Sequence, residues 1–376
     1  PIAGAMARHH PEVETTVAYA SQTVRAQIER LVRPEDAARM GWHELALPRP
    51  IAAATGVLDK IAPVTRLARL RLHQPLFRAS DAVVSTERTC LRVKRRLRPG
   101  TAPLFIRVPH GTGDRSVTFH PDHRQFDLSL VAGPKLKEQL VANGVDAAKI
   151  GVQIGAAGYS KFEGIDFDAQ PDFFGNGRPT FVYNPHFDPH LSSWYDAGPE
   201  VLRWFASEAG QAYNLIFAPH VMLFRKSVHI SPEYKVGRVR PDIPNEARAA
   251  PNILIDTDGP RLFDMSYMLA ADGYIGDASS QIYEFLMRPR PVFLLDPNAA
   301  LGSQGEEVLP FLRTGPRVES VNDLGSAIGG WDEIGPRYRA EQERLIAHTF
   351  ALSEVPASQR AADAIAAAIA RRNGAL

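Results

Sequence analysis

The chain has 376 residues, 44% hydrophobic and 23% charged, a composition typical of a globular protein and unlike that of disordered, collagen-like or coiled-coil chains. Its 43 Lys and Arg residues balance 42 Asp and Glu residues, so no overall charge excess points to nucleic acid. At roughly 150 residues per domain, this length predicts two domains. Cys90 is the single cysteine and cannot form an internal disulfide, which favours a cytoplasmic protein. No Cys/His spacing resembles a zinc site.

No apolar run approaches the ~20 residues needed to cross a bilayer. The first residues, PIAGAMARHHPEVE, lack the basic-then-apolar layout of a secretory signal. We therefore expect a cytoplasmic protein that meets a membrane only from its surface.

Short β-branched or aromatic runs alternate with helix-like stretches, which is typical of parallel sheets with helices packed on them. In the first half, the predicted helices are 2–9, 23–31 and 134–143, and the predicted strands are 13–18, 82–85, 104–108, 126–131 and 150–154. The Gly- and Pro-containing segment 164–179 is the predicted linker. Beyond it, the predicted strands are 180–183, 214–218, 253–255, 274–276 and 291–295, and the predicted helices are 199–209, 261–271, 279–287, 331–352 and 358–372.

This pattern predicts two α/β domains, 1–165 and 166–350, that face each other across a cleft. Residues 351–376 are expected to form a helix that packs back across the domain junction. Such folds bind ligands at the carboxyl ends of their strands.

The first candidate site is the loop 109–113, Pro-His-Gly-Thr-Gly, which follows a predicted strand. A histidine there faces the cleft, and its pKa of about 6.5 lets it accept a proton from an acceptor hydroxyl. Gly111 and Gly113 allow the backbone to approach a ligand closely. The alternative is a loop histidine that bonds a neighbouring carbonyl.

Two further motifs follow strands of the second half. His220 comes after 214–218 and is expected to oppose His110 across the cleft and contact a phosphate or leaving group; a histidine fixed structurally by Pro219 is the alternative. Residues 277–280, Asp-Ala-Ser-Ser, lead into a predicted helix whose free N–H groups and dipole favour phosphate. An ordinary helix cap is the alternative there.

The loop 184–190, Asn-Pro-His-Phe-Asp-Pro-His, contains ligand types that suit a metal. No further carboxylate cluster accompanies it in the sequence, and two prolines stiffen the loop. A substrate-lining or hinge role without a metal is therefore favoured.

The segment 60–98 is rich in basic residues with leucines between them. These basic residues are Lys60, Arg66, Arg69, Arg71, Arg78, Arg88, Arg92, Lys94, Arg95, Arg96 and Arg98. Arginines beside leucines suit an anionic membrane surface. A solvated helix face is the alternative, and nucleic acid is disfavoured because few aromatic residues accompany the charge.

In their order along the chain, these motifs resemble the CDP-glycerol glycerophosphotransferase family, GT-B-fold enzymes that make polyol phosphates of the teichoic-acid type. The resemblance is carried by His-Gly-Thr at 110–112, then IGAAGYSKF, FVYNPHFD, LIFAPH, NILID and DGYIGDASSQIYEFLMRPRPVFLLD, between about residues 82 and 297. It is strongest in the last stretch, through Asp277, Ser279, Ser280, Glu284, Arg290 and Pro291.

The resemblance implies two Rossmann-like domains, with the acceptor on the N-terminal side and the nucleotide donor on the C-terminal side. It implies that His110 is the general base, that His220 binds the donor phosphates, and that Ser279 and Ser280 hold the diphosphate. The other expected substrate-binding residues are Gly111, Thr112, Asp114, Arg115, Asn184, His186, Asp277 and Glu284. Neither a metal nor another cofactor is expected.

This chain departs from the family pattern around the substrates. Family members usually have Trp before the histidine and Pro-Leu-Lys after His-Gly-Thr, whereas Pro109 precedes it here and Gly-Asp-Arg follows at 113–115. Ala278 replaces the usual aromatic residue, and 184–187 replaces a Pro-Thr-aromatic-Arg loop. The resemblance therefore specifies fold and phosphate chemistry more closely than donor and acceptor.

The sequence predicts a transferase that moves a glycerophosphate-like group from a CDP-activated donor to a hydroxyl of a membrane-held lipid or glycolipid. The segment 60–98 would hold it on the inner face of the membrane. One alternative is a GT-B glycosyltransferase or sugar-nucleotide epimerase that uses a UDP-sugar. Another is a nucleotide-binding scaffold without catalysis.

Overall fold

The computed structural model describes residues 1–59, 64–97, 102–108, 111–114, 120–146, 158–305 and 307–374. The chain divides into two compact units. Unit 1 consists of Pro1–His110, Phe119–Gly164 and His348–Leu376, and unit 2 consists of Gly111–Thr118 and Ile165–Ala347. The described loop 111–114 therefore belongs to unit 2.

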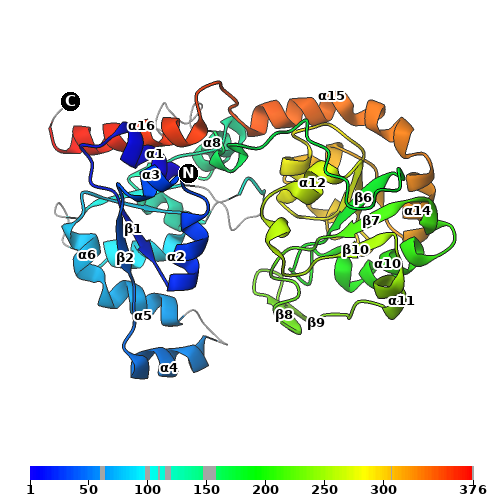
Figure 1. Cartoon of the computed structure of the whole chain (residues 1–376), viewed down its shortest axis with the longest axis horizontal. Helices are drawn as coiled ribbons and strands as arrows, with labels where there is room; N and C mark the ends of the chain where they lie inside the picture. Colours follow the sequence, from blue (N-terminus) through cyan, green and yellow to red (C-terminus); the bar gives the residue numbers. More distant parts are fainter. Residues whose placement is uncertain are drawn as a thin grey trace. The chain divides into compact units, whose positions relative to one another are not determined.

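Unit 2 is built on a six-stranded parallel sheet in the order β10-β7-β6-β11-β12-β13. Figure 1 shows β6, β7 and β10 of this sheet side by side. The strands are β6 Thr180–Asn184, β7 Asn214–Phe217, β10 Ile253–Ile255, β11 Gly273–Gly276, β12 Val292–Leu295 and β13 Arg317–Val318. Numbered along the chain, this is the 3-2-1-4-5-6 order of a doubly wound sheet, whose direction of winding reverses between β6 and β11. Such sheets bind ligands at the carboxyl ends of the strands beside that reversal.

Helices cover both faces of this sheet. On one face, Phe181, Phe217 and Phe293 share a core with α10 Gly198–Ala206, α14 Val321–Gly329 and the start of α15 Trp331–Thr349. Successive strand residues point to opposite faces, so Tyr274, the neighbour of Ile275 in that core, turns to the other face and meets Phe285 of α13. Burial on both faces explains why β6, β7, β11 and β12 are buried at every position.

Unit 2 also contains a separate antiparallel hairpin, which follows β7 and precedes β10 along the chain. It is formed by β8 Val228–Ser231 and β9 Val236–Val239. Its shorter helices are α11 Asn245–Ala249, α12 Ser266–Ala270 and α13 Gln281–Phe285. Its single-turn helices are η5 Ser193–Tyr195, η6 Gly210–Ala212, η7 Pro260–Leu262, η8 Gly302–Gln304 and η9 Pro310–Arg313.

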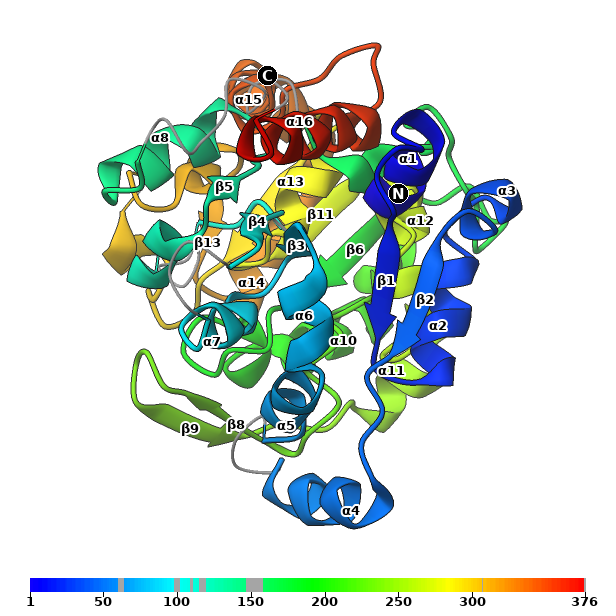
Figure 2. The same cartoon turned by 90° about the vertical axis from the view of Figure 1, so that its left-hand side faces the viewer.

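Unit 1 contains two small parallel sheets, β1-β2 and β3-β4-β5 (Figure 2). The strands are β1 Thr16–Tyr19, β2 Gly41–Glu44, β3 Ala82–Ser85, β4 Leu104–Arg107 and β5 Leu128–Ser129. The helices are α1 Ile2–His9, α2 Gln22–Glu29, α3 Pro34–Ala37, α4 Arg49–Leu58, α5 Val64–Leu72, α6 Gln74–Ala79, η1 Arg88–Cys90, α7 Leu91–Lys94, η3 Pro121–Gln125, α8 Pro134–Ala142, η4 Ser160–Phe162 and α16 Ala357–Arg372. The small residues of α16 let it pack closely on α1, in a core that also contains Ile106 and Leu128.

The predicted parallel α/β architecture is confirmed, whereas several predicted element bounds are wrong. The predicted helix 279–287 shortens to Gln281–Phe285, and the predicted strand 126–131 shortens to Leu128–Ser129 because β4 pairs with only those residues. The predicted strand 150–154 lies outside the described residues. The helices α4, α5 and α6, the strand β2 and the β8-β9 hairpin were not predicted. In the described part of the chain, no helix is both long and apolar enough to cross a bilayer.

Asn252 ties three turns of unit 2 together. Its side chain is 1% exposed, and Nδ2 donates to the carbonyls of Phe205 and Tyr213, both at 2.9 Å. We expect Asn252→Ala to lower the free energy of unfolding by about 2 kcal/mol, because buried carbonyls lose their donor. Urea unfolding tests this, with the exposed Asn322→Ala as the control, for which a change within about 0.5 kcal/mol is expected. Equal losses of unfolding free energy for the two substitutions would contradict this role of Asn252.

Candidate functional site

The candidate site lies at the carboxyl edge of the sheet of unit 2, beside the reversal between β6 and β11. The loops after β6, β7 and β11 meet there, and they carry His186, His220 and Asp277. Neighbouring parallel strands end at the same edge, which brings together residues far apart in the sequence. The structure therefore joins these three sequence-predicted residues within unit 2.

The rings of His186 and His220 lie 5.2 Å apart, centroid to centroid. Phe187 packs against both, with ring centroids 4.5 Å from His186 and 4.7 Å from His220. His186 is 6% exposed and His220 is half-buried. This aromatic packing limits how far either ring can rotate.

Backbone hydrogen bonds orient both imidazoles in the same way. Nδ1 of His186 accepts from the N–H of Asp188 at 3.0 Å, and Nδ1 of His220 accepts from the N–H of Met222 at 3.2 Å. A neutral imidazole that accepts at Nδ1 carries its proton on Nε2. Both histidines are thus set as Nε2–H donors, which suits binding of phosphate oxygens.

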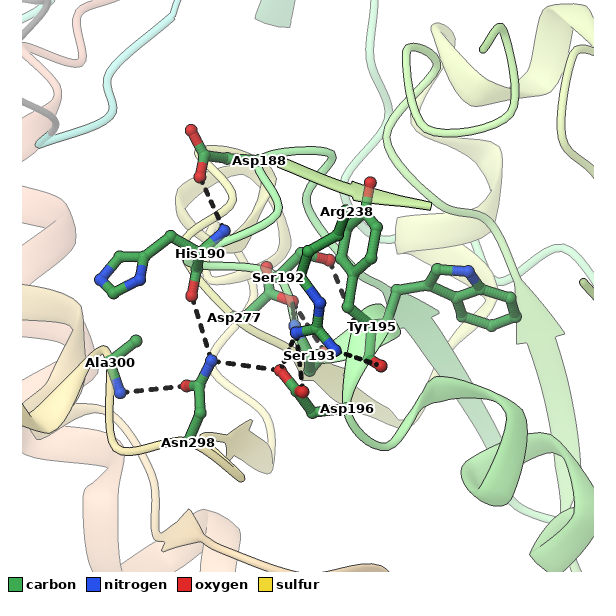
Figure 3. A network of polar contacts seen from close by, with 11 residues as sticks. Asp188, His190, Ser192, Ser193, Tyr195, Asp196, Arg238, Asp277, Asn298 and Ala300 are labelled. Atoms are coloured by element: carbon green, nitrogen blue, oxygen red, sulfur yellow. Dashed lines mark hydrogen bonds and ion pairs between the residues drawn. The ribbon is translucent and has the colours of Figure 1, made fainter. Parts of the chain in front are cut away.

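Asp277 holds the loop after β6 in place. It is fully buried; Oδ1 accepts from the N–H of His186 at 2.8 Å, and Oδ2 accepts from the N–H and Oγ of Ser193, both at 2.7 Å (Figure 3). The Ser193 hydroxyl also lies 2.9 Å from the phenol oxygen of Tyr183. Because both carboxylate oxygens accept hydrogen bonds from the loop after β6, Asp277 holds that loop, and with it His186, in position.

Polar contacts fix the rest of this loop from several sides. Asp188 accepts from the N–H of His190 at 3.0 Å and from Oγ of Ser231, in β8, at 2.8 Å. Arg238 of β9 donates to Asp196 at 2.7 Å and to the carbonyl of Tyr195 at 3.1 Å (Figure 3).

Asn298 completes this support from the loop after β12. Its Nδ2 donates to the carbonyl of His190 and to Asp196, both at 3.2 Å, while its Oδ1 accepts from the N–H of Ala300 at 3.1 Å (Figure 3). The loop that carries His186 is therefore held rigidly by β8, β9 and two neighbouring loops.

Ser280 lies against the described loop 111–114. A Cβ atom added to Gly113 would lie 3.3 Å from Cβ of Ser280, and one added to Gly111 would lie 3.6 Å from its Oγ. Ser280 is half-buried, whereas Ser279 is 2% exposed and its Oγ accepts from the N–H of Gln281 at 3.3 Å. Of the two predicted phosphate-binding serines, Ser280 is the more accessible one.

Other predicted site residues are buried in internal contacts. The hydroxyl of Tyr283 donates to Asp114, and burial together with this carboxylate raises the pKa of Tyr283 well above its ordinary value. Asn184 is fully buried; its Nδ2 donates to the carbonyl of Ala218 at 2.6 Å, and its Oδ1 accepts from Tyr274 at 3.2 Å. Thr112 is 4% and Glu284 5% exposed.

His110 and Arg115 lie outside the described residues, so the predicted general base has no described geometry. Within the described ranges, no group of three His, Cys, Asp or Glu side chains is placed to hold a metal ion. In the loop 184–190, Asp188 supports the loop, and the His190 ring stacks on Tyr234 with centroids 4.1 Å apart.

Sequence reasoning missed three residues that shape this site. Ser193 lies three residues after the predicted motif 184–190, in a single-turn helix, and no local pattern marked it as a partner of Asp277. Phe187 lies within the predicted loop 184–190 and Tyr283 within the predicted helix 279–287, but neither was predicted as a site residue. Arg290, identified only through the family pattern, donates to the carbonyls of Met268, Ala271 and Phe285, and burial lowers its pKa to about 9.

No protein-family model and no curated protein sequence matches the chain. Solved structures are similar to it. The wall teichoic acid polymerase TagF aligns with a TM-score of 0.53 at 15% identity, over 78% of this chain and 74% of that one. A putative UDP-N-acetylglucosamine 2-epimerase from Listeria monocytogenes aligns with a TM-score of 0.51 at 15% identity, over 100% of this chain and 94% of that one. The glycotransferase of kitacinnamycin aligns with a TM-score of 0.54 at 14% identity, over 99% of this chain and 95% of that one.

At these identities the likeness establishes the fold alone. The chain has a GT-B-like fold, a mixed α/β architecture with parallel sheets. This confirms the fold class that the sequence predicted.

Burial raises the pKa of Asp277 to about 7, although three protein donors oppose that shift. Between about pH 4, the ordinary carboxyl value, and pH 7, the folded protein keeps a proton that the unfolded chain releases. This contribution to stability is therefore complete below that window and is lost as pH rises through it. We expect the stability difference between the wild type and Asp277→Asn to fall by roughly 1 kcal/mol per pH unit across it.

Urea unfolding at several pH values between 5 and 8 measures this difference. The control is Asp258→Asn, a substitution at an exposed position, for which a difference from the wild type within about 0.5 kcal/mol is expected. Parallel pH profiles for Asp277→Asn and the wild type would show that Asp277 does not titrate in this range.

Proposed function

We propose that the chain is a transferase that moves a glycerophosphate-like group from a CDP-activated donor to a hydroxyl of a lipid or glycolipid at a membrane surface. The observation that carries the proposal is the pair His186 and His220, oriented as Nε2–H donors at the switch point of a doubly wound sheet. Donors of this kind suit the oxygens of a diphosphate. The family resemblance supplies the donor class, and the fold likeness to TagF, including a variant soaked with CDPG, supports it.

In this proposal the residues of unit 2 hold the donor. His186 and His220 donate to phosphate oxygens, and Ser280 with the glycines at 111 and 113 lies close to the diphosphate. Asp277 is a positioning residue, because it acts through the loop that carries His186. Asn184, Ser279 and Asp114 likewise support the surrounding loops rather than contact the donor.

The reaction needs positioning and charge stabilisation rather than a covalent intermediate. The oxygen of the acceptor hydroxyl attacks the phosphorus that carries the polyol. The bond between this phosphorus and the bridging oxygen breaks, and CMP leaves with the electron pair. The hydroxyl proton passes to His110, the base that the family resemblance implies, while the histidine donors stabilise charge on the departing CMP.

The second candidate is a glycosyltransferase or epimerase that uses a UDP-sugar. It is favoured by the coverage of the fold likeness, which extends over 100% of the chain for the epimerase and 99% for the glycotransferase. The same histidine donors would then contact the diphosphate of a UDP-sugar.

Calorimetric titration with CDP-glycerol, CDP, UDP and UDP-N-acetylglucosamine separates these candidates. We expect the cytidine ligands to bind most tightly, and His220→Ala to weaken them about tenfold or more, because a charge-assisted hydrogen bond is lost. His9→Ala, an exposed histidine of unit 1, is the matched control and should bind like the wild type. Tighter binding of the uridine ligands than of the cytidine ligands would support the second candidate and contradict the first.

The nucleotide product gives an independent answer. CMP released in the presence of a lipid acceptor indicates phosphoryl transfer, and UDP indicates glycosyl transfer. We expect His110→Ala to abolish product formation while donor binding persists. A His110→Ala variant that keeps full biological function would favour the non-catalytic scaffold.

The proposed lipid acceptor and membrane association are supported by an exposed pocket in unit 1. A pocket of about 510 Å³ is lined by Leu47, Ile51, Ala68, Arg71, Leu72, Gln74, Pro75 and Arg78. Leu72 is 48% and Ile51 41% exposed, and the guanidinium groups of Arg71 and Arg78 also lie at the surface. Exposed apolar side chains beside arginines suit a membrane with anionic headgroups.

We expect the full chain to sediment with phosphatidylglycerol-containing vesicles and not with pure phosphatidylcholine vesicles. Combining Arg71→Gln with Arg78→Gln should lower the partition coefficient about 30-fold, since each basic residue contributes about 1 kcal/mol. Arg30→Gln with Arg39→Gln is the control, because both arginines are exposed in unit 1 and lie outside the pocket. Equal losses for the two pairs would mean that overall charge, not this surface, binds the vesicles.

A further inference from the structure

Unit 1 contains a buried basic cluster that the proposed function does not use. Arg107 ends β4 and is 6% exposed, and His123 lies in η3 and is 3% exposed. Arg88, half-buried at the start of η1, is the third member. Arginine is among the residues least often buried without a partner, so the cluster requires an explanation.

The strand register defines where the guanidinium of Arg107 lies. Arg107 pairs with Ser85 of β3 and Ser129 of β5, at the carboxyl edge of the three-stranded sheet. It shares a sheet face with Phe105, two residues earlier, which packs against the helix α7. Arg107 therefore lies on the α7 side of the sheet, with small hydroxyl residues on both neighbouring strands.

Several polar atoms of the cluster lack partners. Nη1 of Arg107 and both ring nitrogens of His123 are buried and have no hydrogen-bond partner in the described part of the chain. A buried donor or acceptor without a partner costs about 1–3 kcal/mol, and more when the group is charged. An acceptor group bound between the two side chains would remove this cost.

No carboxylate of the described residues forms an ion pair with the arginines of the cluster. Among the described residues, no ion pair involves Arg107 or Arg88, and the nearby Asp122 already accepts from Arg95 and Gln125. The parts of unit 1 outside the described residues contain no Asp or Glu in their sequence. Burial and the charge of Arg88 lower the pKa of Arg107 to about 10, and burial with both arginines lowers that of His123 to about 3.

We propose that Arg107, Arg88 and His123 bind one oxyanion, a phosphate or carboxylate group of a ligand, within unit 1. The planar guanidinium of Arg107 pairs with two oxygens of such a group. His123 supplies a ring N–H to a third oxygen, and Arg88 adds charge at the half-buried side. The anion provides the acceptors and the negative charge that the protein itself does not place there.

The test follows the His123 ring by NMR in protein with ¹³C-labelled histidine, assigned with His123→Gln. Inorganic phosphate, and separately acetate, is added at constant ionic strength. A saturable shift of the His123 signal is expected with at least one of them, and the arm that saturates at lower concentration identifies the anion. Arg107→Met should weaken the response at least tenfold, because a charge-assisted bond is lost.

Arg92→Met is the matched control, since Arg92 is exposed on the neighbouring α7 and should leave the response unchanged. His220→Ala should also leave it unchanged, which separates this site from the proposed donor site. Should Arg107→Met fail to fold, Arg88→Met, half-buried, should weaken the response in the same direction.

Stability gives a second readout. In anion-free buffer, Arg107→Met should melt at a higher temperature than the wild type, because an unpaired buried cation is removed. Phosphate should then stabilise the wild type and not the variant. A His123 signal that neither anion shifts saturably, or an equal response in Arg107→Met, would overturn the proposal.

Discussion

The candidate site depends on one buried interaction, the clamp between Asp277 and the loop after β6. Two strands end side by side at the reversal of the sheet, and their loops would diverge without a connection between them. Asp277, after β11, accepts from His186 and Ser193 on the other loop and so joins the two. These donors offset part of the cost of burying the carboxylate, and the result is a fixed position for His186.

The second consequence of this clamp is electrostatic. Its carboxylate is fully buried, and Asp188 is 4% exposed and engaged by Ser231 and the backbone, so both carboxylates are turned to protein donors. Two imidazoles that accept at Nδ1 present donors at Nε2. An edge with this character suits a phosphorylated ligand better than a cation.

Two arginines of the chain differ in how their polar atoms are satisfied. In unit 2, half-buried Arg290 donates to several backbone carbonyls, so its charge is surrounded by acceptors. In unit 1, Arg107 is 6% exposed at a strand end, and its Nη1 has no partner among the described residues. This difference in hydrogen bonding is the reason that Arg107, and not Arg290, is proposed to bind an anion.

The sequence by itself determined the α/β class, five of the six parallel strands of unit 2 and the motifs that follow them, because strand and helix periodicities are local properties; the two-residue strand β13 is too short for such a pattern. It also predicted His186, His220 and Ser280 as site residues through their places after strands. Only the tertiary structure decided that the two histidines adjoin, that Asp277 faces inward to Ser193, and that Arg107 lies unpaired. Those outcomes depend on strand order and register, which bring together residues as far apart as 186 and 277, and no local pattern encodes such distances.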